Sequence, residues 1–326
     1  MGVCDNTSCM EEAALSTASF SDATIFLLEH CSLCPRACGA NRVAGARGVC
    51  GAADELRIAR AALHFWEEPP ISGNAGSGAV FFSNCPLHCV YCQNEPIANG
   101  SCGVDVSVRR LACIFLELQD QGALNVNLVT PTHYVPQIIE AAKLAREAGL
   151  TIPFVYNTSG YETPETIVLL KELVDTYLVD FRYIDAQTAC SYSKAPTYPE
   201  FAMASLDAMV KQGAHVIVRV LLLPTHLEET KRIVRYVHET YAVQETLGQL
   251  KLSLMSQYTP MGTFPLHPEL EQRVDPEAFE ELLDYADDIG CDDYFWQEGG
   301  AAEESFIPDF ASHEGVVGPE LASCAE

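Results

Sequence analysis

Apolar runs and amphipathic stretches alternate along most of the chain, and a glycine often ends one stretch before the next run begins. The six runs that we expect to form strands are 79–83, 123–129, 152–156, 176–181, 215–223 and 251–255. These runs are mostly apolar, which is typical of strands that are buried on both faces of a parallel sheet. The recurring order of helix, glycine and strand predicts repeated βα units.

Apolar positions three and four residues apart predict a helix after most of these runs. The expected helices begin at Ser107, Val135, Pro164, Glu200, Thr225 and Pro276, and a short one covers residues 23–29. Pro164 would occupy the first helical position, where its missing N–H costs no hydrogen bond. Thr225 and Glu228 have the spacing of a capping box.

Six βα units predict the fold class, an α/β protein with a partial (β/α)6 barrel of the TIM type. A group of cysteines before these units, described below, adds a small N-terminal cysteine-rich metal module. Catalytic groups then belong at the carboxyl ends of the strands. We divide the chain into a loosely ordered N-terminus at 1–21, the module with a connecting hairpin at 22–78, the barrel core at 79–300 and a C-terminal tail at 301–326.

The composition of the 326 residues is that of an ordinary globular protein, with 48% hydrophobic and 20% charged residues. No apolar run approaches the ~18 residues that a membrane span needs. The N-terminus lacks the basic and apolar regions of a signal peptide, so we expect a cytoplasmic protein without a membrane partner. The net charge of −26 argues against a nucleic-acid partner, which requires a basic surface.

Three of the fourteen cysteines, Cys85, Cys89 and Cys92, follow the first expected strand at a C-x3-C-x2-C spacing. A [4Fe–4S] cluster normally takes four thiolates, so three from one loop would leave one iron open. An open metal position is where a metal site does chemistry. A zinc knuckle or free thiols are the alternatives, although zinc sites prefer paired C-x2-C units.

Four further cysteines, Cys31, Cys34, Cys38 and Cys50, lie within twenty residues of one another. Thiolates at this density predict a second metal site, which suits tetrahedral zinc or an auxiliary iron–sulfur cluster equally by spacing. Unmetallated thiols are the alternative.

Polar residues follow the expected strands at one end of the barrel. These segments are Thr130–His133, Asn157–Tyr161, Asp180–Tyr183 and Ser256–Pro260, and Arg219 lies within the fifth strand. Arginine is rarely buried unless it is paired. Arg219 therefore either pairs with Asp180 or faces the carboxylate or ribose of a ligand.

With these motifs, the chain resembles the radical S-adenosylmethionine (SAM) proteins of the pyruvate formate-lyase activating enzyme-like branch, with an extra N-terminal cysteine module. The segments that carry the resemblance are 31–42, 67–73, 85–94, 128–134, 156–161, 180–183 and 254–258. Two positions depart from that branch. Thr130-Pro131-Thr132 stands in place of Gly-Gly-Glu, and Asn157 stands where glycyl-radical activases tend to carry aspartate.

The resemblance implies a [4Fe–4S] cluster on Cys85, Cys89 and Cys92 and a SAM molecule bound to it. In such enzymes one electron splits SAM into methionine and a 5′-deoxyadenosyl radical, which abstracts a hydrogen from a substrate. The expected cofactor contacts are Tyr91, Thr130, Thr132, Asn157, Ser159, Asp180, Arg182, Arg219 and Gln257.

The resemblance further suggests a protein or peptide substrate, with a glycine Cα of a partner enzyme first, and an electron donor such as flavodoxin or ferredoxin. Two alternatives remain. One is the same radical chemistry on a small molecule, and the other is a non-catalytic iron–sulfur or zinc protein.

Overall fold

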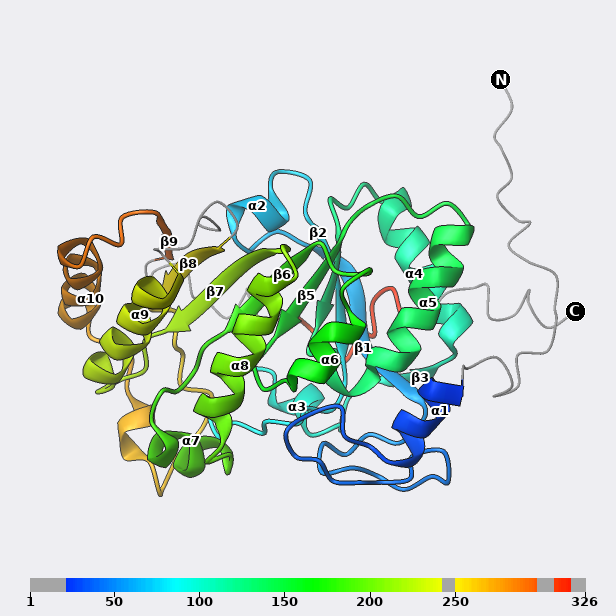
Figure 1. Cartoon of the computed structure of the whole chain (residues 1–326), viewed down its shortest axis with the longest axis horizontal. Coiled ribbons are helices and arrows are strands. Elements are labelled where there is room, and N and C mark those ends of the chain that lie inside the picture. Colours follow the sequence, from blue (N-terminus) through cyan, green and yellow to red (C-terminus); the bar gives the residue numbers. More distant parts are fainter. Residues whose placement is uncertain (1–21, 242–249, 298–307, 318–326) are drawn as a thin grey trace, which may run out of the picture.

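A sheet of nine strands runs through the centre of the computed structural model, which describes residues 22–241, 250–297 and 308–317. The spatial order is β3-β1-β2-β4-β5-β6-β7-β8-β9 (Figure 1). The strands are β1 Leu56–His64, β2 Ser77–Phe82, β3 Val104–Val106, β4 Val126–Val129, β5 Phe154–Thr158, β6 Thr176–Asp180, β7 His215–Leu221, β8 Leu250–Met255 and β9 Tyr294–Gln297.

The six expected strands are confirmed as β2, β4, β5, β6, β7 and β8, and neighbours in this series pair in parallel. β2, β4 and β5 are buried at every position, as their apolar runs predict. The fold is therefore α/β with a partial barrel of the TIM type.

The sheet also continues beyond both ends of this series of six strands. β9 adds a further parallel strand beside β8. β1 pairs antiparallel with β2, so the expected hairpin exists but its second arm is the first barrel strand itself. The short strand β3 then pairs antiparallel with β1.

The helices α4, α5, α6, α8 and α9 lie along one side of the sheet (Figure 1). The helices are α1 Asp22–Glu29, α2 Pro69–Ser72, α3 Glu95–Ala98, α4 Val108–Asp120, α5 Val135–Glu147, α6 Pro164–Leu169, α7 Ala186–Ser193, α8 Tyr198–Lys211, α9 Leu227–Tyr241 and α10 Pro276–Asp288. Two 3-10 turns cover Thr132–Tyr134 and Pro268–Glu271.

Side chains cap several of these helices where the sequence predicts their starts. The Ser107 hydroxyl accepts from Arg110 N, and Asp275 accepts from Glu277 N. The expected capping box of Thr225 and Glu228 is wrong, because Thr225 has a φ of 66° and α9 begins only at Leu227. α7 was not expected at all.

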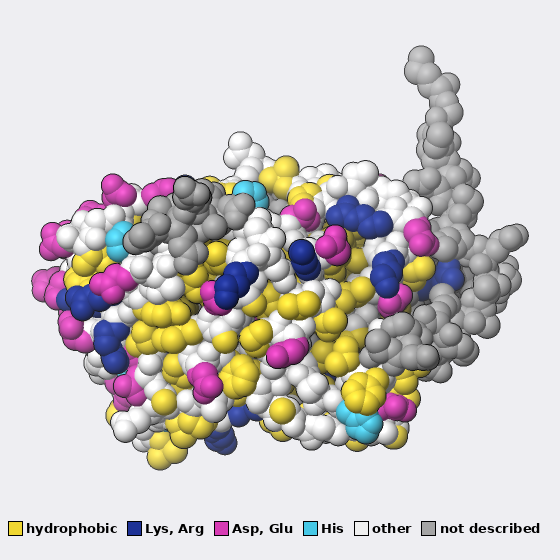
Figure 2. Space-filling view, in the orientation of Figure 1, with side chains coloured by type: hydrophobic (Ala, Val, Ile, Leu, Met, Phe, Trp, Pro, Cys, Tyr) yellow, Lys and Arg dark blue, Asp and Glu magenta, His cyan; other side chains and the backbone are white. Residues whose placement is uncertain are grey.

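Acidic side chains gather at the end of the molecule that α9 and α10 form (Figure 2). α10 alone contributes Glu277, Glu280, Glu281, Asp284, Asp287 and Asp288. Part of the net charge of −26 is therefore concentrated at one end of the sheet.

The segment 31–53 packs against the carboxyl ends of the strands. Arg42 is fully buried and donates to the carbonyl oxygens of Ala53 and His133. Thr166 at α6 donates to Leu33 O at 2.9 Å. The expected loose N-terminus at 1–21 lies outside the described residues, as does the expected tail apart from residues 308–317.

Candidate active site

A cavity of about 840 Å³ lies where the parallel strands end. The residues that line it include Cys85, Cys89 and Cys92 and the segment from His64 to Glu67. Both tryptophans of the chain, Trp66 and Trp296, also line it, and their exposed fractions are 60% and 53%. This volume is within the usual range of ligand pockets, about 300–1,000 Å³.

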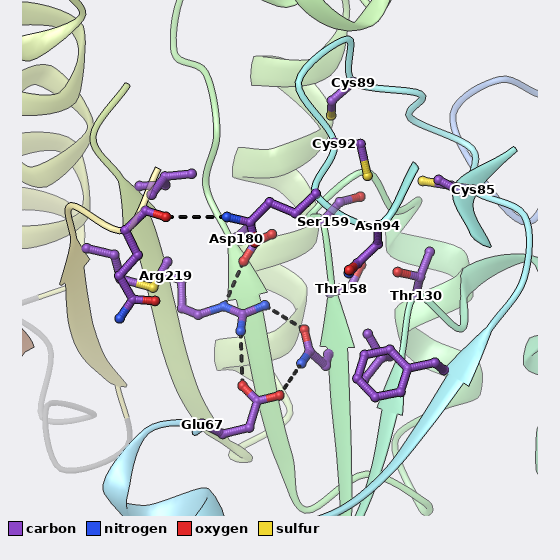
Figure 3. A pocket seen from close by; sticks show the side chains of 18 of the residues that line it. Glu67, Cys85, Cys89, Cys92, Asn94, Thr130, Thr158, Ser159, Asp180 and Arg219 are labelled. Atoms are coloured by element: carbon purple, nitrogen blue, oxygen red, sulfur yellow. Dashed lines mark hydrogen bonds and ion pairs between the residues drawn. The ribbon is translucent and has the colours of Figure 1, made fainter. Parts of the chain in front are cut away.

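The three cysteines of the loop after β2 point their sulfur atoms into one space at the edge of this cavity (Figure 3). The loop turns sharply because Asn84 and His88 adopt left-handed backbone conformations, with φ of 75° and 56°. His88 is exposed, and its Nε2 lies 3.1 Å from Val49 O. The predicted catalytic cysteines therefore share one face of one loop.

Hydrogen-bond donors from three segments face the sulfur atoms. Ser193 Oγ donates to Cys89 Sγ at 3.2 Å, and Arg182 Nη1 donates to the same sulfur at 3.4 Å. Leu87 N donates to Cys85 Sγ at 3.4 Å. Such donors favour the ionised form of a thiol and tune iron–sulfur sites.

Burial has the opposite effect on two of these thiols. It raises the pKa of Cys85 above its usual value, and it raises the pKa of Cys92 to about 12. Both carry a proton at neutral pH in the metal-free chain, so metal binding must displace protons here. Three convergent thiols with donors at their sulfurs fit a cluster that is held by three thiolates.

A network of buried charges crosses the cavity floor next to the cysteines (Figure 3). Arg219 donates to Asp180 Oδ1 at 2.7 Å, to Glu67 Oε2 at 3.2 Å and to Asn157 Oδ1 at 2.6 Å. Arg182 Nη2 donates to the other oxygen of Asp180 at 2.6 Å. Of the two expectations for Arg219, pairing with Asp180 is therefore confirmed.

The charges in this network set the ionisation of its members. Burial alone would raise the pKa of Asp180, but Arg219 and Arg182 hold it below its usual value. Burial raises the pKa of Glu67, and Arg219 opposes that rise. Asn157 is held by both sides, because its Nδ2 donates to Glu67 Oε1 at 3.2 Å while its Oδ1 accepts from Arg219.

The cavity brings together most of the predicted cofactor contacts. The residues of that set that line it are Tyr91, Thr130, Asn157, Ser159, Asp180, Arg182, Arg219 and Gln257. Thr130 has a φ of 58°, which is unfavourable for a β-branched residue and is held by Thr130 N donating to Asn157 O. The Tyr91 hydroxyl lies 2.8 Å from that of Tyr183, and the side-chain amide of Gln257 pairs with Gln297.

Thr132 is the exception, because it lies outside the cavity. Its hydroxyl donates to the buried Glu162 Oε1 at 2.6 Å, as do the hydroxyls of Thr158 and Tyr156. Burial raises the pKa of Glu162 to about 7, and Glu162 Oε2 has no hydrogen-bond partner.

Two residues of the site were not predicted. Glu67 lies in the segment 67–73 that carries the family resemblance, but it comes from outside the repeated βα units and no role was predicted for it. Ser193 ends α7, a helix without a clear apolar pattern. Neither residue carries a local pattern that reveals its role.

The four N-terminal thiols lie close to one another. Cys31, Cys34 and Cys50 are buried and Cys38 is exposed. A Cβ added to Gly48 would lie 3.2 Å from Cys38 Sγ and 3.4 Å from Cys50 Sγ, so these sulfurs flank one glycine. Burial raises the pKa of Cys34 and Cys50, and charges on Cys31 and Cys50 would add to the effect on Cys34.

Within the described ranges, no three His, Cys, Asp or Glu side chains converge closely enough to hold a single metal ion. Cluster ligands bind separate iron atoms, so they need not converge on one point. None of the helices in the described part of the chain has the length and apolar character needed to cross a membrane.

The fold and the cavity together define the class of protein: an α/β partial barrel with a three-cysteine loop at the carboxyl ends of its strands. Residues 79–237 match the sequence profile of the radical SAM superfamily. The matched segment contains Cys85, Cys89, Cys92, Asp180 and Arg219.

An uncharacterized protein of Methanocaldococcus jannaschii is 27% identical over 277 residues, which cover 82% of this chain and 77% of that protein. Two solved structures are similar in fold. SuiB of Streptococcus suis bound to the precursor peptide SuiA is 15% identical, with a TM-score of 0.47 over 66% of this chain and 46% of SuiB. Native anSMEcpe with bound AdoMet and the Kp18Cys peptide is 12% identical, with a TM-score of 0.47 over 65% of this chain and 60% of that one. This chain thus spans about half the length of SuiB.

Proposed function

We propose that this chain is a cytoplasmic radical SAM enzyme in which Cys85, Cys89 and Cys92 hold a [4Fe–4S] cluster and SAM binds in the adjoining cavity. The convergence of three thiols from one loop into that cavity carries the proposal, and the family match of residues 79–237 supports it. A cluster held there would supply the one electron needed to cleave bound SAM reductively, so that 5′-deoxyadenosine forms and the unpaired electron passes to a substrate carbon.

The side chains of the cavity divide into two roles in this proposal. Thr130, Asn157, Ser159 and Gln257 line the cavity and would offer polar atoms to SAM, although the Asn157 and Gln257 side chains also hydrogen-bond within the protein. Tyr91 lies within the cysteine loop, where its ring packs against Tyr192. Asp180, Arg182 and Arg219 act mainly on one another and on Cys89, so they orient the site. We leave Thr132 out, because its hydroxyl faces Glu162.

We propose a glycine Cα of a partner enzyme as the first candidate for the hydrogen donor. The chain that leaves the cavity at Tyr258 carries two exposed apolar side chains, Met261 at 48% and Leu266 at 87%. An exposed apolar loop beside a cavity suits a protein partner. A glycyl radical that appears by electron paramagnetic resonance (EPR) in such a partner would support this choice.

A small-molecule substrate is the second candidate, and the size of the cavity favours it. At about 840 Å³ the cavity is near the upper end of single-ligand pockets, which leaves room beside SAM. SAM cleavage that accelerates with a metabolite in the absence of any protein partner would select this candidate. In either case flavodoxin or ferredoxin would supply the electron.

We also propose that Cys31, Cys34, Cys38 and Cys50 hold a second metal site, either an auxiliary iron–sulfur cluster or zinc. Their mutual proximity and the burial of three of them support it. Zinc would have to draw these thiols closer together on binding, because no three of them converge on one ion in the described part of the chain. Loading would have to remove protons from Cys34 and Cys50, whose pKa values burial raises.

The test of the main proposal uses anaerobically reconstituted full-length protein with SAM and dithionite. We expect 5′-deoxyadenosine by chromatography from the parent protein and none from Cys89→Ala. Cys190→Ser, which replaces an exposed thiol, is the matched control and should retain the product. A parent protein with full cluster iron that leaves SAM intact, and whose cluster EPR spectrum SAM does not change, would favour the non-catalytic alternative.

A further inference from the structure

The Arg36 side chain donates to four carbonyl oxygens at once. Its Nε donates to Pro86 O at 2.9 Å, and its Nη2 donates to Leu87 O at 3.2 Å and to Ser193 O at 2.8 Å. Its Nη1 donates to Lys194 O at 2.6 Å. Four acceptors from two separate segments fix the orientation of the planar guanidinium.

These four acceptors belong to the two segments that surround one cysteine. Pro86 and Leu87 lie inside the loop between Cys85 and Cys89. Ser193 and Lys194 form the carboxyl end of α7, where a cation also complements the helix dipole. Arg36 therefore ties the cysteine loop to the end of α7.

The Ser193 hydroxyl connects the Arg36 contacts to Cys89. Ser193 is 1% exposed, and its Oγ donates to Cys89 Sγ at 3.2 Å. The backbone oxygen of the same residue accepts from Arg36. Because Arg36 holds the backbone of Ser193, it also sets the position from which the hydroxyl reaches Cys89.

Arg36 itself belongs to the N-terminal cysteine module, residues 31–50. Arg36 stands between Cys34 and Cys38, and Ala37 N donates to Cys34 O at 2.9 Å in a tight turn. A second contact joins the module to the loop, since His88 Nε2 lies 3.1 Å from Val49 O, next to Cys50. A metal on these thiols would fix the backbone that carries Arg36.

We propose that Arg36 is a positioning residue that couples the metal-bound state of the N-terminal module to the reduction potential of the cluster at Cys89, through Ser193. Donors to a cluster sulfur stabilise the more negative, reduced state and so raise its potential. Loss of the Ser193 hydrogen bond would make the cluster harder to reduce. This inference rests on the proposed cluster, and it adds a role for the module.

The test is a potentiometric titration of the reconstituted full-length protein, followed by EPR without SAM. We expect more negative midpoint potentials for Ser193→Ala and Arg36→Gln at unchanged cluster iron. Ser193→Thr keeps a hydroxyl and should remain near the parent value. Arg47→Gln is the control within the module, because Arg47 donates to Gly51 O at 2.8 Å inside it.

Cys38→Ser tests whether the metal site of the N-terminal module affects the cluster potential. Cys38 is exposed, so its replacement disturbs little packing. We expect the same negative shift, and no additional shift in the double variant with Arg36→Gln. If Arg36→Gln fails to retain the cluster iron, the midpoint potentials of Ser193→Ala and Cys38→Ser alone test the inference. Parent-like potentials in Ser193→Ala or in Cys38→Ser would overturn the inference, whereas a parent protein that assembles no cluster would instead overturn the proposed function.

Discussion

Asp180 and Arg219 are register partners on the neighbouring parallel strands β6 and β7, and Arg219 Nε donates to Asp180 Oδ1 at 2.7 Å. The pair is mostly buried, with exposed fractions of 16% for Arg219 and 15% for Asp180. Arg219 also binds Glu67 and Arg182 also binds Asp180, so two arginines face two carboxylates in the cavity floor.

Arg219→Met is expected to destabilise the metal-free protein strongly, because it leaves Asp180 and Glu67 buried without their main partner. Removing one member of a buried ion pair costs about 3–5 kcal/mol in the free energy of unfolding. Urea unfolding measures this change. Lys211→Met removes an exposed pair with Asp207 and should change stability by less than about 1 kcal/mol, so equal effects would contradict the argument.

Glu162→Gln should remove the loss of folding stability that Glu162 causes as the pH rises. Burial raises the pKa of Glu162 to about 7 in the folded chain, above its usual value of 4.5. The folded state therefore binds more protons between these values, and the Glu162 contribution to stability is lost as the pH rises through that window.

The measurement is the difference in unfolding free energy between the parent and Glu162→Gln at pH 5 and at pH 8. The variant should gain relative to the parent at pH 8, because glutamine has no charge to bury. The control is Glu165→Gln, which removes an exposed carboxyl in the first turn of α6. A difference that stays constant with pH would contradict the raised pKa.

Gly160→Ala should destabilise the protein more than Gly149→Ala does. Both glycines have positive φ, 76° and 105°, so both replacements carry backbone strain. Only at Gly160 would the new Cβ also collide with a backbone oxygen, that of Asp180. We expect an additional loss of about 1–3 kcal/mol from overpacking, measured by urea unfolding, and equal losses would show that Asp180 moves aside freely.

Cys34→Ser should remove one metal site and leave the other. We expect mass spectrometry of the purified, anaerobically loaded protein to show loss of zinc or of the auxiliary iron, with the iron of the Cys85 loop retained. Cys291→Ser replaces a buried thiol shortly after α10, outside both groups of cysteines, and should keep both metals. Parent-like metal content in Cys34→Ser would mean that the N-terminal thiols bind no metal.

Periodicity predicted the central strands because each contains a buried apolar run, and all but β6 follow closely after a glycine. β9 was missed because Tyr294–Gln297 is short, follows two aspartates and has no fully buried position. The pairing of Arg219 with Asp180 was one of two expectations, because arginine is rarely buried unless it is paired. The contact of Ser193 with Cys89 spans 104 residues and depends on α7, so no local pattern could reveal it.

The positions of Trp66 and Trp296 give this protein a built-in optical reporter. Indole emission changes with the polarity around the ring, and both indoles of the chain stand in the wall of the same cavity. Fluorescence of the unlabelled, metal-free chain therefore reports on that one place, and a titration with SAM can be followed there before any cluster is assembled.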